Sequence, residues 1–155
     1  MLRFDVRRAR DGEIATAALV QPGDAAFAGL DMALAEPVEI QGTLQSSGRG
    51  AYLWRGTVHG RVRAQCRRCL KDLLVGFNAE ATALFSSDPE VADDPGVHPL
   101  TEPVTIIDLS DAVREEVGLA APAYPLCREE CAGLCPTCGA DLNLGPCACR
   151  SRDTN

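Results

Sequence analysis

Eight cysteines carry the strongest chemical signal in this sequence. They fall into four close pairs: Cys66-x2-Cys69, Cys127-x3-Cys131, Cys135-x2-Cys138 and Cys147-x-Cys149. Short spacing lets two thiolates reach one metal ion from a single turn, and four thiolates form a closed tetrahedral zinc site. Iron–sulfur ligation is chemically possible, but the knuckle-like spacing favours zinc. The pairs therefore predict two four-cysteine zinc sites.

Chain geometry favours one grouping of the pairs. The last two pairs are joined by only eight residues, 139–146, so they can close one site locally. The first two pairs would then meet across the fold and tie the tail to a strand end. The favoured sites are Cys66/Cys69/Cys127/Cys131 and Cys135/Cys138/Cys147/Cys149. In the alternative, Cys127, Cys131, Cys135 and Cys138 share one site, and the outer pairs stay free or join each other.

Enzymatic chemistry finds little support in the sequence. A site closed by four cysteines has no open coordination position, so it builds structure rather than catalysing hydrolysis. The two histidines, His59 and His98, lie in no recognisable nucleophile–base motif. We find no glycine-rich phosphate loop, nucleophile elbow or paired carboxylate motif. We expect no catalytic residues, no enzyme activity and no small-molecule substrate.

Charge is distributed unevenly along a chain whose net charge is −7. Residues 40–71 contain no acid, whereas residues 72–130 contain 13 acids and two arginines. A second basic cluster, Arg3, Arg7, Arg8 and Arg10, lies near the start. These halves could pair with each other, or a basic face could bind an anionic partner. The basic stretch contains Arg49, Arg55, Arg61, Arg63, Arg67, Arg68 and Lys71.

Alternation of apolar and polar residues predicts three strands, over 37–44, 51–65 and 73–85. The turn residues 45–50 predict that the first two form a hairpin. In the second strand, Tyr52, Trp54 and Val58 share the core face with Val62 and Ala64. The opposite face presents a solvated ladder of Arg55, Thr57, His59, Arg61, Arg63 and Gln65.

Helical spacing predicts one helix, from an N-cap at Asp108 to a stop at Pro122 and Pro125. Residues 86–103 predict an acidic, mobile loop because they contain four prolines and five acids. The fold class is α+β: an antiparallel sheet that could close into a barrel, one packed helix and a zinc-stapled tail. We expect a sheet-and-helix domain at 1–125, the cysteine-rich tail at 126–149 and a disordered end at 150–155.

Two segments resemble the YceD family. Cys66-Arg67-Arg68-Cys69-Leu70 is similar to its Cys-x-Arg-Cys-Leu hallmark, and residues 126–143, with Cys135-Pro136-Thr137-Cys138-Gly139, are similar to its C-terminal signature. The similarity covers roughly residues 36–149. It implies a bacterial cytoplasmic protein needed for accumulation of large-subunit (23S) ribosomal RNA, and the family is not regarded as enzymatic.

Two classes of binding role follow. In the first, the chain binds large-subunit ribosomal RNA or a pre-ribosomal particle, with phosphate contacts from the basic strand. In the second, the acidic segment 79–116 is a scaffold that engages a basic ribosomal or assembly protein, and the basic strand pairs internally. A zinc or thiol redox switch is a third hypothesis. The candidate nucleic-acid-binding residues are Arg55, His59, Arg61, Arg63, Arg67 and Arg68.

The sequence predicts a cytoplasmic location without a membrane partner. No apolar run approaches the roughly 18 residues that a membrane span needs, and no apolar stretch follows the basic N-terminus to make a secretory signal. In the reducing cytoplasm, cysteines are not kept as disulfides, which agrees with a metal-binding role.

Overall fold

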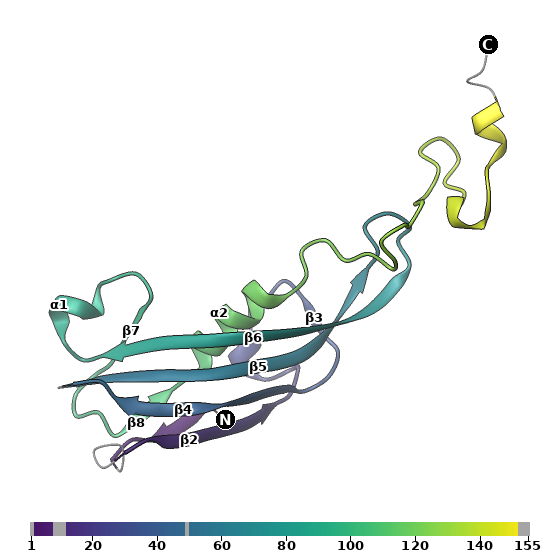
Figure 1. The fold of residues 1–155 in the computed structure, drawn as a ribbon. Coiled ribbons are helices and arrows are strands. Elements are labelled where there is room, and N and C mark those ends of the chain that lie inside the picture. Colours follow the sequence, from purple (N-terminus) through teal and green to yellow (C-terminus); the bar gives the residue numbers. More distant parts are fainter. Residues whose placement is uncertain (1, 8–11, 49, 152–155) are drawn as a thin grey trace. The chain divides into compact units, whose positions relative to one another are not determined.

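The computed structural model describes residues 2–7, 12–48 and 50–151. Arg8, Arg10 and Arg49 of the predicted basic clusters lie outside these residues. The chain divides into two compact units (Figure 1). Unit 1 comprises Met1–Val62 and Gly76–Ala121, and unit 2 comprises Arg63–Val75 and Pro122–Asn155. Residues 63–75, which we assigned to the sheet domain from the sequence, thus group with the cysteine-rich tail.

Strands dominate the structure. The larger sheet has the order β2-β4-β5-β6-β7, with β3 paired to β5, and a two-stranded sheet joins β1 to β8. The strands are β1 Arg3–Asp5, β2 Ile14–Val20, β3 Ala33–Leu34, β4 Val38–Ser46, β5 Ala51–Gln65, β6 Asp72–Ser86, β7 Val97–Pro99 and β8 Ile106–Asp108. The helices are η2 Ala25–Phe27, α1 Pro89–Ala92, α2 Ser110–Ala120, η3 Leu142–Leu144 and η4 Ala148–Ser151. No helix of the described part of the chain is long and apolar enough to cross a membrane.

The three predicted strands are confirmed as β4, β5 and β6. β4 and β5 form the expected antiparallel hairpin, with Leu44 opposite Trp54 and Ile40 opposite Val58. These four side chains are fully buried. Period-2 alternation located the strands because each buries one face and exposes the other.

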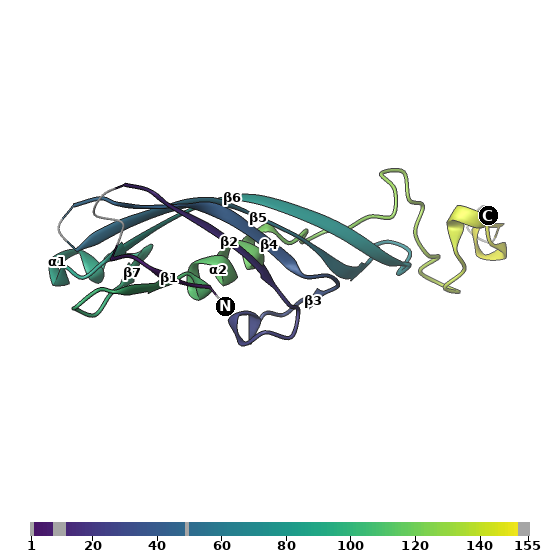
Figure 2. The ribbon, with the colours of Figure 1, turned by 90° about the horizontal axis from the view of Figure 1, so that it is seen from below.

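The covering layer of unit 1 comes from α2, β1 and β8, which lie on the concave side of the curved sheet (Figure 2). Val113 and Val117 of α2, Ile107 of β8 and Leu109 are all fully buried. This layer removes the apolar face from water without closure of the sheet. The expectation of a barrel is therefore wrong: the larger sheet is open, with β2 at one end of the strand order and β7 at the other.

Local details differ from the sequence expectations. β7 pairs with β6 in parallel, so the sheet is not wholly antiparallel. The predicted acidic loop 86–103 carries α1 and β7; Asp88 starts α1 by accepting the N–H of Glu90. Asp108 ends β8, and the cap position belongs to Leu109. The Asp108 carboxylate still accepts the N–H of Ser110 at 2.9 Å. Of the predicted disordered end, residues 150 and 151 lie in η4, and 152–155 fall outside the described residues.

Trp54 anchors the core of unit 1 and explains two glycines. Its indole N–H donates to the hydroxyl of buried Thr16 at 2.9 Å. A Cβ on Gly42 would lie 2.4 Å from the Arg55 carbonyl oxygen and 2.9 Å from the Trp54 indole nitrogen. A Cβ on Gly56 would lie 2.6 Å from the same ring. Only glycine at these two positions, on β4 and β5, leaves room for the indole ring of Trp54.

We predict that Gly42→Ala lowers the free energy of unfolding by about 3 kcal/mol, because backbone atoms must move to admit the methyl group. Gly76→Ala is the matched control, since a Cβ there would meet nothing closer than 3.9 Å. It should change stability by less than about 0.5 kcal/mol. Denaturant unfolding followed by fluorescence of Trp54, the single tryptophan, measures both; equal effects would contradict the prediction.

Candidate metal centre

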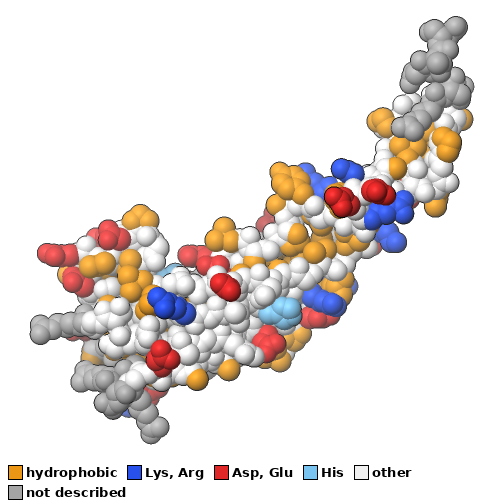
Figure 3. Space-filling view, in the orientation of Figure 1, with side chains coloured by type: hydrophobic (Ala, Val, Ile, Leu, Met, Phe, Trp, Pro, Cys, Tyr) orange, Lys and Arg blue, Asp and Glu red, His pale blue; other side chains and the backbone are white. Residues whose placement is uncertain are grey.

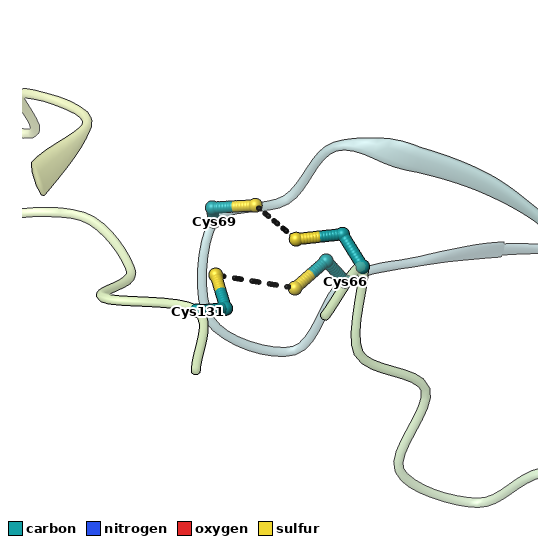
Figure 4. Close-up of side chains that lie close together, drawn as sticks. Cys66, Cys69 and Cys131 are labelled. Carbon is teal, nitrogen blue, oxygen red and sulfur yellow. Dashed lines mark hydrogen bonds between the residues drawn. The ribbon is translucent and has the colours of Figure 1, made fainter. Parts of the chain in front are cut away.

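Four cysteines from distant parts of the sequence meet in unit 2. The first cluster consists of Cys66, Cys69, Cys127 and Cys131, whose sulfur atoms all lie within 4.8 Å of one another. The Sγ atoms of Cys66 and Cys131 are 3.8 Å apart, and those of Cys69 and Cys127 are 3.6 Å apart. Figure 4 shows Cys66, Cys69 and Cys131 pointing toward one another. All eight cysteines are free thiols.

The sulfur spacing fits a tetrahedral metal ion. A zinc–sulfur bond of about 2.3 Å gives a tetrahedron whose edges are about 3.8 Å long. The two measured separations, 3.6 and 3.8 Å, match this edge. Cys66 and Cys131 are buried and the other two are half-buried, so the four thiols converge on a point largely shielded from water. The cluster could therefore hold one metal ion.

The second cluster lies wholly in the tail. It consists of Cys135, Cys138, Cys147 and Cys149, again with all sulfur atoms within 4.8 Å. Cys135 is buried, whereas Cys138 is exposed. The structure thus groups the cysteines as in the favoured partition, and it does not join Cys127 and Cys131 to the second cluster. The second site is the more open of the two.

Each cluster is built on a knuckle of the same backbone shape. In residues 66–71, the N–H of Leu70 donates to the Cys66 carbonyl, and the N–H of Cys66 donates to the Lys71 carbonyl, both at 2.9 Å. In residues 135–140, Gly139 and Cys135 make the equivalent two bonds at 2.8 Å. Both knuckles need a left-handed residue, which is Leu70 at φ 60° and Gly139 at φ 72°. Glycine adopts this conformation readily, whereas a side chain such as that of leucine rarely does.

Hydrogen bonds from the knuckle backbone favour thiolates. The N–H of Cys69 is the main cause that lowers the pKa of Cys66 to about 6. The N–H of Cys138, followed by that of Thr137, lowers the pKa of Cys135 to about 6. Burial raises the pKa of Cys127 to about 12. Each knuckle therefore stabilises a negative sulfur before any cation is bound, which is the chemistry a metal ligand requires.

The first knuckle is also held by hydrogen bonds to the tail. The guanidinium of Arg68 donates to the carbonyls of Glu129 and Cys131 at 3.1 and 3.0 Å. The N–H of Leu134 donates to the Arg68 carbonyl at 3.1 Å. A Cβ on Gly133 would lie 3.0 Å from that carbonyl oxygen, so glycine permits the close approach. The sequence predicts Arg68 as an RNA contact. In the structure, its hydrogen bonds hold the knuckle against residues 129–134 of the tail.

Asn143 connects the two clusters. It lies in η3, within the segment that joins Cys138 to Cys147 of the second cluster. Its side-chain nitrogen donates to the Cys131 sulfur of the first cluster at 3.5 Å. Its side-chain oxygen accepts the N–H of Ala132 at 2.9 Å and a guanidinium N–H of Arg128 at 2.7 Å. Such outer contacts orient a ligand and tune its basicity. No local sequence pattern predicts this contact, because Cys131 and Asn143 lie 12 residues apart.

The predicted RNA-binding residues divide between the units. In unit 1, Arg55, His59 and Arg61 lie exposed on one face of β5, and Arg61 pairs with Glu36 at 3.6 Å. In unit 2, Arg63, Arg67 and Arg68 are exposed. The predicted core aromatics Tyr52 and Trp54 are buried. Tyr124, for which the sequence predicts no role, is 75% exposed and lies under the Arg67 guanidinium.

Most of the chain matches the model of one known protein family. The family described as Large ribosomal RNA subunit accumulation protein YceD matches residues 54–155, about two thirds of the chain and all of unit 2. The chain belongs to the YceD family. The resemblance first noted at residues 66–70 and 126–143 is thereby confirmed. The family's description refers to accumulation of large-subunit ribosomal RNA and names no binding partner.

The similar curated proteins are mycobacterial and uncharacterised. One of Mycobacterium tuberculosis and one of Mycobacterium bovis are each 34% identical over 95 residues, which cover 59% of this chain and 45% of theirs. One of Mycobacterium leprae is 30% identical over 95 residues, 59% of this chain and 43% of its own. The chain thus spans less than half the length of these relatives. No solved structure matches.

Removal of a cysteine from either cluster should remove one metal ion. We predict that the full chain binds two zinc ions, that Cys66→Ser binds one, and that Cys147→Ser also binds one, because each variant destroys a different cluster. Zinc content after gel filtration, measured by elemental mass spectrometry, checks this. Unchanged stoichiometry and folding in Cys66→Ser would contradict a site built across the chain.

Asn143→Ala should weaken zinc binding at the first cluster by about 10- to 100-fold, because Cys131 loses its hydrogen-bond donor and Ala132 its acceptor. A competition titration against a chromophoric chelator, run in the Cys147→Ser background, reports this cluster alone. Asn78→Ala, at an exposed position of β6, is the control and should bind as tightly as the parent. Equal affinities in the two variants would show that the contact does not support the cluster.

Proposed function

We propose that this chain is a non-enzymatic cytoplasmic factor for accumulation of large-subunit ribosomal RNA. In this proposal it binds pre-ribosomal RNA, free or in an assembly intermediate, and two zinc ions hold unit 2 in shape. The observation that carries the proposal is the family match over residues 54–155. The cysteine clusters and the exposed arginines supply its physical content.

Zinc is the metal that the donor set supports best. Four thiolates on a tetrahedron of this size suit Zn²⁺, which has no geometric preference of its own and binds sulfur well. An iron–sulfur cluster would spread its cysteine ligands, because its own iron and sulfide atoms lie between them; sulfur atoms within 4.8 Å of one another leave no room for it. Zinc closed by four cysteines supplies structure, which fits a binding role better than catalysis.

The exposed arginines favour an anionic partner. Among the residues that the structure describes, no acid lies within ion-pair distance of Arg55, Arg63 or Arg67, and Arg61 has one exposed partner, Glu36. Such an exposed pair contributes little and separates readily. Cations without an acidic partner are available to phosphates, whose neutralisation releases counterions and drives binding. The scaffold hypothesis needed this basic strand to pair internally, so RNA binding is the better supported of the two.

The proposal is tested by ultraviolet crosslinking in cells, followed by sequencing of the attached RNA. We expect crosslinks concentrated on large-subunit ribosomal RNA. They should fall strongly in the triple variant Arg55→Gln/Arg61→Gln/Arg63→Gln. In vitro, the same variant should reduce the slope of log affinity against log salt by about 2, since each phosphate contact to single-stranded RNA contributes about 0.7.

The matched control removes the same charge elsewhere. Arg3, Arg7 and Arg114 pair with Asp108, Asp5 and Asp111, respectively, so Arg3→Gln/Arg7→Gln/Arg114→Gln should keep the crosslinks. A signal no higher than background for the unaltered protein would overturn RNA binding and favour the scaffold built on acidic residues 79–116. Under mild oxidant, zinc release with disulfide formation would instead favour the redox switch.

A further inference from the structure

Tyr124 is an exposed aromatic ring that the core does not explain. It is 75% exposed, whereas Tyr52 and Trp54 are buried. It belongs to the segment Pro122-Ala123-Tyr124-Pro125-Leu126 of unit 2, which leads to the first cluster at Cys127. Proline fixes its own φ and restricts the residue before it, so Pro125 stiffens the backbone at Tyr124. The ring is therefore presented to solvent by a stiff segment.

Arg67 lies over this ring. The centre of its guanidinium is 4.6 Å from the Tyr124 ring centroid, within the range of cation–π attraction. The N–H of Arg67 donates to the Pro125 carbonyl at 2.9 Å, and its guanidinium reaches the Ala123 carbonyl at 3.4 Å. The bonds to the residues before and after Tyr124 fix the pair. Because Arg67 lies between Cys66 and Cys69, the first cluster holds one side of the pair in place.

The segment that carries Arg67 is basic. Residues 63–75 of unit 2 contain Arg63, Arg67, Arg68 and Lys71 against a single acid, Asp72, whose carboxylate accepts a hydrogen bond from Gln65 at 3.0 Å. Figure 3 shows Lys and Arg side chains gathered with apolar ones where β5 ends and β6 begins, beside acidic side chains of the same region. An exposed aromatic ring and a planar cation thus lie in a region suited to phosphates.

We propose that Tyr124 and Arg67 form a stacking platform for an unpaired base of RNA, with Arg63 and Lys71 contacting neighbouring phosphates. This inference rests on the proposed function and names the part of the RNA that unit 2 recognises. Proteins bind unpaired nucleotides by stacking bases on aromatic rings and guanidinium planes. Paired bases hide their faces within the helix, so the platform selects loops, bulges and ends over duplex.

An apolar protein partner is the competing occupant of an exposed tyrosine. The observations favour RNA because the ring is covered on one face by a cation rather than by aliphatic groups, and because nearby cations outnumber the acid in residues 63–75. A protein partner would have to bury these charges, which costs free energy unless it supplies paired acids. RNA neutralises these positive charges with the phosphates of its own backbone.

The test measures binding of the full zinc-loaded chain to a labelled unpaired oligoribonucleotide of about 10 nucleotides, and to a duplex of the same sequence. Tyr124→Ala should weaken binding to the unpaired probe by about 5- to 100-fold, whereas Tyr124→Phe should bind like the parent. Arg67→Lys should keep the salt dependence, because the charge remains, yet lose affinity, because the guanidinium plane is gone. Zero-length ultraviolet crosslinks should map to Tyr124.

Controls separate this inference from the proposed function. Leu119→Ala removes an 81% exposed apolar side chain of unit 1 and should leave binding unchanged. Zinc content shows whether Tyr124→Ala keeps both clusters. If the parent binds RNA and a zinc-loaded Tyr124→Ala binds equally well, the platform is overturned and the ring is left to a protein partner, while the proposed function stands. If the parent binds no RNA, the proposed function and the platform both fail.

Discussion

The meeting of four thiols from two distant segments is the constraint on which unit 2 depends. Cys69 and Cys127 are 58 residues apart in the chain, yet their sulfur atoms lie 3.6 Å apart. A cross-link that closes a loop of this length offsets about 4 kcal/mol of chain entropy. The zinc ion that we propose for this cluster would supply about 10 kcal/mol or more. The knuckle, its hydrogen bonds to the tail and the position of Tyr124 all follow from this closure.

The two arginines inside the first knuckle are both exposed, but they make different contacts. Arg68 donates to Glu129 and Cys131 carbonyls and so fixes the tail. Its neighbour Arg67 is exposed and lies on Tyr124. Metal geometry does not explain Leu70, since Gly139 makes the same turn in the second knuckle without the roughly 1 kcal/mol cost of a left-handed side chain. Leu70 is also 58% exposed, so burial of its side chain does not explain it either.

Regular patterns made part of this structure predictable. Alternation located β4, β5 and β6, and chain distance grouped the cysteines correctly. β2 escaped notice because its buried face includes the polar Thr16, whose burial is explained only by the indole N–H of Trp54, 38 residues away. Three-residue strands such as β1, β7 and β8 are too short to show a period. The tail carbonyls that Arg68 meets, and the ring that Arg67 covers, are long-range contacts with no local signal.

The boundary of the family match cuts through the core of unit 1. The match begins at Trp54, yet the indole of that residue is satisfied by Thr16 of β2 and seated against Gly42 of β4. Strands β2 and β4, which lie outside the matched residues, thus complete the core against which β5 packs. Residues 54–155 carry both cysteine clusters, the basic face of β5 and Tyr124. An N-terminal segment of different sequence can serve equally well, provided that it buries the same face of β5 and offers the indole a hydrogen-bond acceptor.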